Sequence, residues 1–462
     1  MKNSYHAIIA LICLILLKPL YAGDLFNSFI QESPSIREIT HSGLDYHLDH
    51  IELLRESRND TLLSRYAIRR QYISYTQELK ILKFDLLYTR DILELDDILN
   101  SDYTHTNVVP KAHTFGVNTQ FEIGKHKIRP GFKYSFSGFQ DTLFIKEYPS
   151  SETKIYNDYF FDLIPSTFGD SLIYKNLFHK LNFEFYIENF NKDKGYSFYG
   201  QFVRSQNKLS EDHFNSGDVD KLAGPRSTLN LYTSTQVNTL LSLKLSSKSI
   251  IDVGLDLGFS PLNWSHTVFP NDPDTLEIIT LTDAKLKLFS CKLTYRHVEN
   301  NTNFKISLHA GHIDANAHLA TPVLGYLFGL LPIAHQGDFD LNTNYFQTIT
   351  QIDYIFELDF LSIKPRLDLL GGLYTSHLDV LALLQFGIED IDIQEKYLHF
   401  ALLASPGINT VFNLNSDLFM YLDISQLIPI VKQLSPEPTP IVPDGISRYG
   451  GLSVSLGVGM EW

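Results

Sequence analysis

Long runs of alternating apolar and polar residues constrain the fold of this chain most strongly. In the run 229–245 the odd positions carry Leu, Thr and Val, whereas most even positions carry Asn, Ser, Gln or Lys. The runs 250–260 and 128–136 alternate in the same way. Successive strand side chains point to opposite faces, so each run predicts a strand with one apolar and one polar face. Such runs exceed the ordinary soluble strand and fit a tilted strand that crosses a bilayer, which needs about 9–11 residues.

The end of the chain repeats this pattern. From Leu452 to Trp462 the even positions are apolar and the odd positions are Ser, Gly or Glu. The last residue is aromatic. This segment resembles the last strand of bacterial outer-membrane β-barrel proteins, whose terminal aromatic residue is read by the barrel assembly machinery. Family members end more often in Phe, so Trp462 is a less common variant of this membrane-assembly signal. The alternative is an edge strand of a soluble sheet.

The first residues have the pattern of an export signal. Lys2 precedes an apolar run over residues 7–17, and a small residue, Ala22, follows. We interpret residues 1–22 as a cleaved signal peptide, with an uncleaved anchor as the alternative. Cleavage removes Cys13 and leaves Cys291 as the remaining thiol, so the mature chain forms no internal disulfide. The expected location is the outer membrane, in contact with its lipid.

The strand pattern predicts an all-β fold, a transmembrane antiparallel up-and-down β-barrel over residues 79–462. We expect about fourteen strands, within a range of twelve to sixteen, because residues near Tyr156 form one further candidate. Short connections alternate with connectors of roughly twenty to forty residues, as in barrels with short periplasmic turns and longer external loops. The predicted strands lie near 80–89, 113–123, 127–138, 180–190, 195–204, 228–245, 250–260, 284–296, 303–311, 346–360, 363–376, 397–409, 416–425 and 449–462.

Residues 23–78 show a different spacing. Leu44, Leu48 and Ile51 recur at helical intervals, and Leu62, Leu63 and Tyr66 follow. The spacing predicts a short helical N-terminal segment that plugs the lumen or lies in the periplasm. Several Arg residues here suggest a docking surface, and the alternative is a solvated helix face.

Charged residues on the polar faces are candidates for the lumen. A turn at Leu361–Ser362 would place Asp359 opposite Lys364 and Glu357 opposite Arg366, and a short connection after Lys244 would place it opposite Asp252. Directly opposed unlike charges support a strand register. They either line a selective pore or stiffen the wall, and their near balance predicts no ion preference. The candidate lumen-facing charges are Arg129, Lys133, Lys244, Asp252, Asp256, Glu357, Asp359, Lys364 and Arg366.

Two expected external loops are unusually apolar, namely 317–334 and the segment that begins at Leu378. Apolar surface of this kind is rarely left in water, so we expect these loops to fold over or into the barrel mouth. They would line a route for a hydrophobic solute or pack against one another. The first arrangement resembles the fourteen-stranded fatty-acid transporter family, but the chain lacks that family's Asn-Pro-Ala signature, so the analogy concerns architecture only.

Composition limits the partners and the chemistry. The chain has 53 acidic and 38 basic residues and a formal charge of −15, which argues against nucleic acid. The His309–His312 spacing, the His312–Asp314 pair and the acidic residues from Asp272 to Glu277 are weak candidates for metal binding or catalysis, and we expect no cofactor and no enzyme activity. An outer-membrane hydrolase is the minor alternative. The sequence predicts a channel or passive transporter for small solutes, hydrophobic ones included, with a structural or surface-attachment barrel as the alternative.

Overall fold

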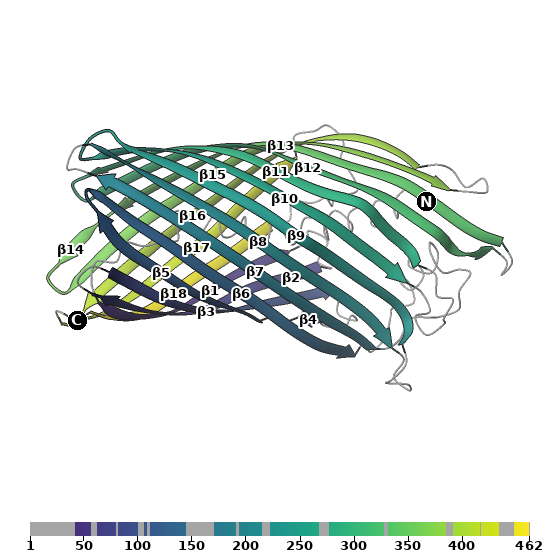
Figure 1. The fold of residues 1–462 in the computed structure, drawn as a ribbon, viewed down its shortest axis with the longest axis horizontal. Helices are drawn as coiled ribbons and strands as arrows, with labels where there is room; N and C mark the ends of the chain where they lie inside the picture. The colour runs from purple at the N-terminus through teal and green to yellow at the C-terminus, as the bar shows by residue number, and fades with distance from the viewer. Residues whose placement is uncertain are drawn as a thin grey trace.

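The computed structural model is a single closed β-sheet (Figure 1). It describes residues 42–56, 62–79, 82–99, 106–108, 111–144, 171–190, 194–214, 222–267, 277–327, 331–384, 391–415, 417–433 and 448–461. Within these residues, no helix is long and apolar enough to cross a membrane. The signal-peptide prediction for residues 1–22, the candidate strand near Tyr156 and the aromatic residue Trp462 lie outside them.

Among these residues, eighteen strand segments form the sheet, and every pairing between them is antiparallel. The short segments β4 and β14 pair with the same strands as β5 and β13 and continue them, so the barrel has sixteen strands. The segments are β1 (Gly43–Glu56), β2 (Leu62–Glu78), β3 (Leu82–Leu99), β4 (Thr106–Val108), β5 (Lys111–Ile123), β6 (His126–Phe144), β7 (Ser171–Phe190), β8 (Gly195–Phe214), β9 (Leu222–Lys244), β10 (Ser249–Thr267), β11 (Glu277–Glu299), β12 (Thr302–Leu327), β13 (Leu331–Tyr354), β14 (Phe356–Leu358), β15 (Leu361–Leu384), β16 (Ile391–Asn413), β17 (Leu418–Gln433) and β18 (Arg448–Glu461).

The prediction of an all-β antiparallel up-and-down barrel is confirmed, but the expected number of about fourteen strands is too low. Each of the fourteen predicted segments overlaps a different strand, and the two missed strands are β1 and β2. The prediction of a helical N-terminal segment is therefore wrong for residues 43–56 and 62–78. β1 pairs with both β2 and β18 and closes the barrel, with Gly43 opposite Glu461.

The helical prediction fails because some residue spacings fit both a helix and a strand. Leu44 and Leu48 are four residues apart, so they share a face in a helix and also in a strand. Both are exposed on the outer face of β1, at 42% and 39%. Ile51 alone departs from this parity and falls on the inner face.

The turns at one end of the barrel are short. Connections of two to four residues join β2 to β3, β5 to β6, β7 to β8, β9 to β10, β11 to β12, β14 to β15 and β16 to β17. Gly124 and Asn300 adopt positive φ angles of 63° and 51° in two of the tightest turns, a conformation that Gly and Asn tolerate best. β1 begins and β18 ends at this same end.

At the other end the strands extend far beyond a bilayer. β12 has 26 residues, which corresponds to roughly 86 Å along the strand at about 3.3 Å per residue. The connectors there are mostly shorter than expected, and only 145–170 reaches the predicted length. The apolar segments expected to be loops are largely strands: Ala317 to Leu327 lie in β12, Leu331 to Ala334 in β13, and Leu378 to Leu384 in β15.

Exposed apolar side chains surround the outside of the barrel. They alternate with buried polar residues, as the sequence predicts: Leu241 is 40% exposed and the adjacent Ser242 only 4%. We call this surface the outer belt. Its members, taken from strands around the whole barrel, include Leu48, Ile73, Leu86, Phe115, Phe183, Phe198, Leu241, Leu257, Phe289, Leu308, Phe346, Leu373, Ile408, Ile424 and Leu456.

Candidate functional site

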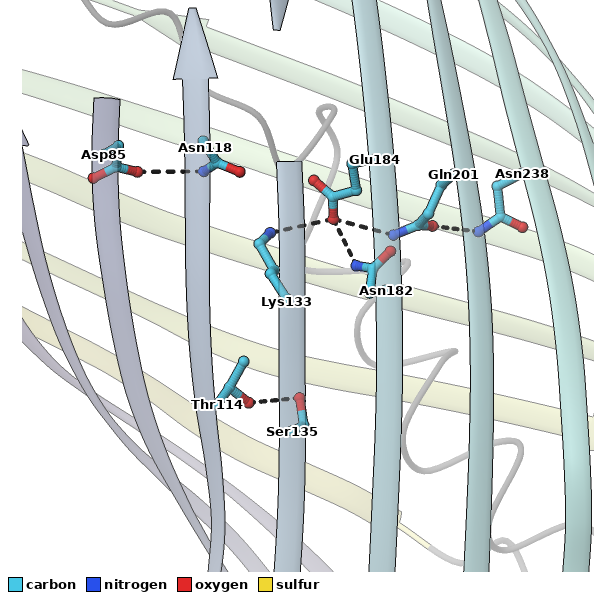
Figure 2. A network of polar contacts seen from close by, with 9 residues as sticks. All are labelled: Asp85, Thr114, Asn118, Lys133, Ser135, Asn182, Glu184, Gln201 and Asn238. Carbon is cyan, nitrogen blue, oxygen red and sulfur yellow. Dashed lines mark hydrogen bonds and ion pairs between the residues drawn. The ribbon is translucent and has the colours of Figure 1, made fainter. Parts of the chain in front are cut away.

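The inner wall of the barrel carries a continuous polar network across β6 to β9 (Figure 2). Glu184 is its centre, because its Oε1 accepts hydrogen bonds from Asn182 Nδ2 at 2.6 Å and Gln201 Nε2 at 3.3 Å and lies 3.2 Å from Lys133 Nζ. Asn238 Nδ2 then donates to Gln201 Oε1 at 2.6 Å. The network arises because these residues occupy alternate positions between outward Phe and Leu residues.

Arg129 forms a second centre closer to the short turns. The residue is 3% exposed; its Nε donates to Gln120 Oε1 and one terminal nitrogen donates to Glu188 Oε1, each at 2.8 Å. The guanidinium also lies 4.8 Å from the centre of the Tyr186 ring. A buried guanidinium is stabilised only when its charge and its donors are satisfied in this way.

Ion pairs continue around the rest of the wall. Arg296 lies 2.7 Å from Asp252, and Lys364 lies 3.2 Å from Asp353. Arg366 lies 2.9 Å from Asp423, on a strand two positions away. Arg70 and Asp91, which are 2.6 Å apart on β2 and β3, form a further pair, so unlike charges join neighbouring strands and, at Arg366, strands two positions apart.

The predicted cross-strand partners are wrong at both turns. The β14–β15 turn lies at residues 359–360, so Glu357 is opposite Ser362, and Glu357 and Asp359 are exposed beside this turn. Asp252 is opposite Ser242 and Lys244 is opposite Ile250. Each error is a register shift by an even number of residues, which preserves the alternation of side chains between the two faces of a strand but changes the residue across from each one.

Three further candidate lumen-facing charges, Asp256, Lys133 and Arg129, have polar partners in the structure. Asp256 accepts a hydrogen bond from Ser290 Oγ at 3.0 Å, and Lys133 and Arg129 bind the carboxylates described above. The sequence reasoning missed Glu184, Glu188, Asp353 and Asp423. Each lies in a predicted strand, and Glu184 and Glu188 alternate with Phe and Ile, so the signal for their face was present although their partners were not predictable.

The weak candidates for catalysis do not come together. His309 and His312 lie on opposite faces of β12, and His312 Nδ1 is 2.9 Å from Asn344 Oδ1. Among the described residues, no three His, Cys, Asp or Glu side chains are placed to hold a metal ion. Residues 271–276 lie outside the described part of the chain.

The polarity of the wall inverts beyond the outer belt on β11 to β13. There the inner face is apolar, and the outer face carries Lys287, Asp314 and other polar residues. The buried inner residues are Leu286, Ile313, Ala315, Ala317 and Leu341, each at most 9% exposed. One end of the interior is therefore polar and charged, and part of the other end is apolar.

Comparison with known proteins gives likenesses of fold. No protein-family model matches the chain, and no curated protein matches it. CdiB from Acinetobacter baumannii is 12% identical with a TM-score of 0.38, and the match covers 90% of this chain but only 60% of CdiB. The Pseudomonas putida toluene transporter TodX is 10% identical with a TM-score of 0.37, over 94% of this chain and 92% of TodX. A Pseudomonas aeruginosa FadL homologue is 10% identical, also with a TM-score of 0.37, over 91% and 90%. No specific family is identified.

Proposed function

We propose that this protein is an integral outer-membrane β-barrel that acts as a channel or passive transporter for small solutes. The observation that carries this proposal is the number of strands in the closed sheet, sixteen. The interior of an eight-stranded barrel is filled by side chains, whereas barrels of sixteen to eighteen strands leave an aqueous passage. The polar inner wall around Glu184 and Arg129 agrees with a water-filled lumen.

The outer belt supports the membrane location. Exposed apolar side chains on strands around the barrel would be costly in water and are favourable in lipid. The short turns would face the periplasm and the strand extensions the exterior, as is usual for such barrels. Insertion in this orientation would bring the chain into contact with outer-membrane lipid and, before that, with the barrel assembly machinery.

The polarity inversion favours solutes with an apolar part. A solute that enters from the strand extensions would meet the apolar part of the inner wall, to which Leu341 belongs, before it reaches the charged part. Apolar lining residues lower the free energy of an apolar solute by removing its surface from water, by about 25 cal/mol for each Å². This gradient supports transport of small hydrophobic or amphipathic molecules.

Planar-bilayer recording tests the channel. Purified protein should give steady single-channel openings, whereas a correctly folded protein that stays silent would favour the structural or surface-attachment barrel. Proteoliposome uptake of a small aromatic hydrocarbon and of a sugar of similar size tests the solute class. Leu341→Asn should slow uptake of the hydrocarbon more than uptake of the sugar, and Asn342→Gln, on the opposite face of β13, should change neither.

A further inference from the structure

The outer belt ends in basic and imidazole side chains on β3, β5 and β7. On β3 the outward residues Leu82 and Leu86 are exposed, and Arg90 is the first charged residue at an outward position beyond them. His113 follows Phe115 and Val117 in this way on β5, and His179 follows Phe183 and Leu181 on β7. These three polar residues lie at the level where a belt inside a bilayer would meet the lipid headgroups.

The three residues also lie in one cross-strand row, in which Arg90 and His113 are neighbours and Phe136 separates His113 from His179. Arg90 is opposite His113, His113 is opposite Phe136, and Phe136 is opposite His179. The ring centres of His113 and Phe136 are 5.4 Å apart with an interplanar angle of 23°. The row therefore combines three nitrogen-bearing side chains with an aromatic ring, which suits the boundary between acyl chains and headgroups.

Each histidine of the row is held by a tyrosine from the preceding strand. Tyr88 Oη lies 2.9 Å from His113 Nδ1, and Tyr134 Oη lies 2.8 Å from His179 Nδ1. The same diagonal Tyr–His arrangement thus occurs twice. It engages Nδ1 of both rings and leaves Nε2 as the nitrogen able to donate to a ligand.

Arg90 has an unsatisfied donor. Its Nε is buried and has no hydrogen-bond partner among the residues that the structure describes. A buried N–H of a cation is costly unless an acceptor binds it, and phosphate oxygens are well suited to the planar guanidinium. An anionic oxygen at this position would satisfy the donor.

We propose that Arg90 and His113, which are directly opposite each other, bind the phosphate group of a membrane-lipid headgroup, with Phe136 against the first part of its acyl chains and His179 on the far side of that ring. This inference rests on the membrane location proposed above. A lipid is the preferred source of the phosphate because the row continues directly from the outer belt, where headgroups necessarily lie once the belt is embedded. The distribution of charge also favours this row as the anion site. The corresponding outer surface of β12 to β15 is acidic and carries Asp314, Asp338, Asp340 and Asp379.

Native mass spectrometry of the delipidated full-length protein tests this site with two lipids that differ only in the phosphate. Phosphatidic acid should remain bound at concentrations where diacylglycerol of the same chains does not. Arg90→Gln with His113→Gln should weaken phosphatidic acid binding about tenfold, the loss expected for one or two charge-assisted hydrogen bonds. Lys396→Gln, an exposed residue of β16 on another part of the outer surface, should have no effect.

Three results would overturn the proposal: equal retention of both lipids, equal loss in the Lys396→Gln control, or displacement of phosphatidic acid by millimolar inorganic phosphate, which would indicate a soluble anion site. Arg90→Gln alone provides a second variant if the double variant does not fold, and it should reduce binding in the same direction. Single-channel recording separates the two proposals. Variants that lose lipid binding but conduct normally would show that the change is confined to the lipid site. Failure of the unsubstituted protein to insert into the bilayer would refute the membrane location.

Discussion

Lys133 on β6 and Glu184 on β7 form an ion pair of 3.2 Å in which the glutamate side chain is fully buried and the lysine side chain is 12% exposed. The pair joins two neighbouring strands on the inner wall, and Asn182 and Gln201 bind the same carboxylate oxygen. Its charges therefore compensate each other within the wall.

Removing the carboxylate should change ion selectivity. Glu184→Gln keeps a side chain of the same shape but leaves the Lys133 charge uncompensated, so the lumen becomes more positive and anions should be favoured. The measurement is the reversal potential in a salt gradient across a planar bilayer. Lys133→Met added to Glu184→Gln should restore the original value, and Glu299→Gln, in an exposed pair at the short turns, should leave it unchanged. An unaltered reversal potential in Glu184→Gln would mean that this wall does not contact the ion path.

The outer belt makes a second prediction, at Leu241. Replacement by Arg places a charge on the middle of the belt and should lower the free energy of unfolding in lipid by about 2–4 kcal/mol. Leu241→Phe keeps the surface apolar and should cost much less. Urea titration of folding into lipid vesicles measures both. Similar values for the two variants would be incompatible with a lipid-facing position.

Glycine and aromatic residues of β18 and β17 are tightly matched. A Cβ atom on Gly457 would lie 2.2 Å from the Tyr421 ring, and one on Gly459 would lie 2.2 Å from the Phe419 ring. Gly457→Ala should therefore lower stability by about 1–3 kcal/mol, the usual cost of overpacking. Tyr421→Ala should remove this penalty when the two are combined, so a double-mutant cycle of unfolding free energies should show coupling. Additive effects would indicate that the ring does not cover the glycine.

Asp340 on the outer surface of β13 makes a prediction about pH. Partial burial raises the pKa of this carboxyl, and Asp314, Asp379 and Asp338 raise it further. A folded-state pKa above the unfolded value means that folding favours the protonated form, so the stabilising contribution is complete at low pH and is lost as pH rises through the folded pKa. Asp340→Asn should thus raise the melting temperature at pH 7 and have little effect at pH 3. The exposed Asp359→Asn is the control, and a pH-independent gain at Asp340 would contradict the charge explanation.

The alternation of apolar and polar residues predicts which face of a strand a side chain occupies, because a register error of two residues leaves the face unchanged. The same error changes the residue that lies opposite on the neighbouring strand. Leu241 and Ser242 lie on opposite faces as predicted, and Lys364 and Arg366 lie in the predicted strand. Their partners, Asp353 and Asp423, were not predicted, since a turn displaced by two residues changes every cross-strand neighbour. Such a shift leaves the hydrophobic pattern unchanged, so only the three-dimensional structure distinguishes the registers.

Two other features lay beyond the sequence pattern. The spacing of β1 predicts a helix wrongly, because Leu44 and Leu48 fit both the helical and the strand periodicity. Ile51 alone fits the helical spacing and not the strand alternation. The apolar residues of 317–334 were assigned to a loop because a membrane-crossing strand needs far fewer residues than β12 contains. Ala315 and Ala317 face inward there, so the rule of apolar residues outside holds only within the outer belt.

The pairing of β1 with β18 makes the last step of folding different in kind from all the others. Every other seam joins consecutive strands and can form as a local hairpin or after a modest connector, whereas this one joins residues 406 positions apart, as in the hydrogen bond from Ser455 to Asp49. Closing so long a chain segment costs more entropy than closing a hairpin, although the cost grows only with the logarithm of length. The β1–β18 pairing should therefore form more slowly than the pairings between consecutive strands. We expect the barrel to open first between β1 and β18 under force or in denaturant.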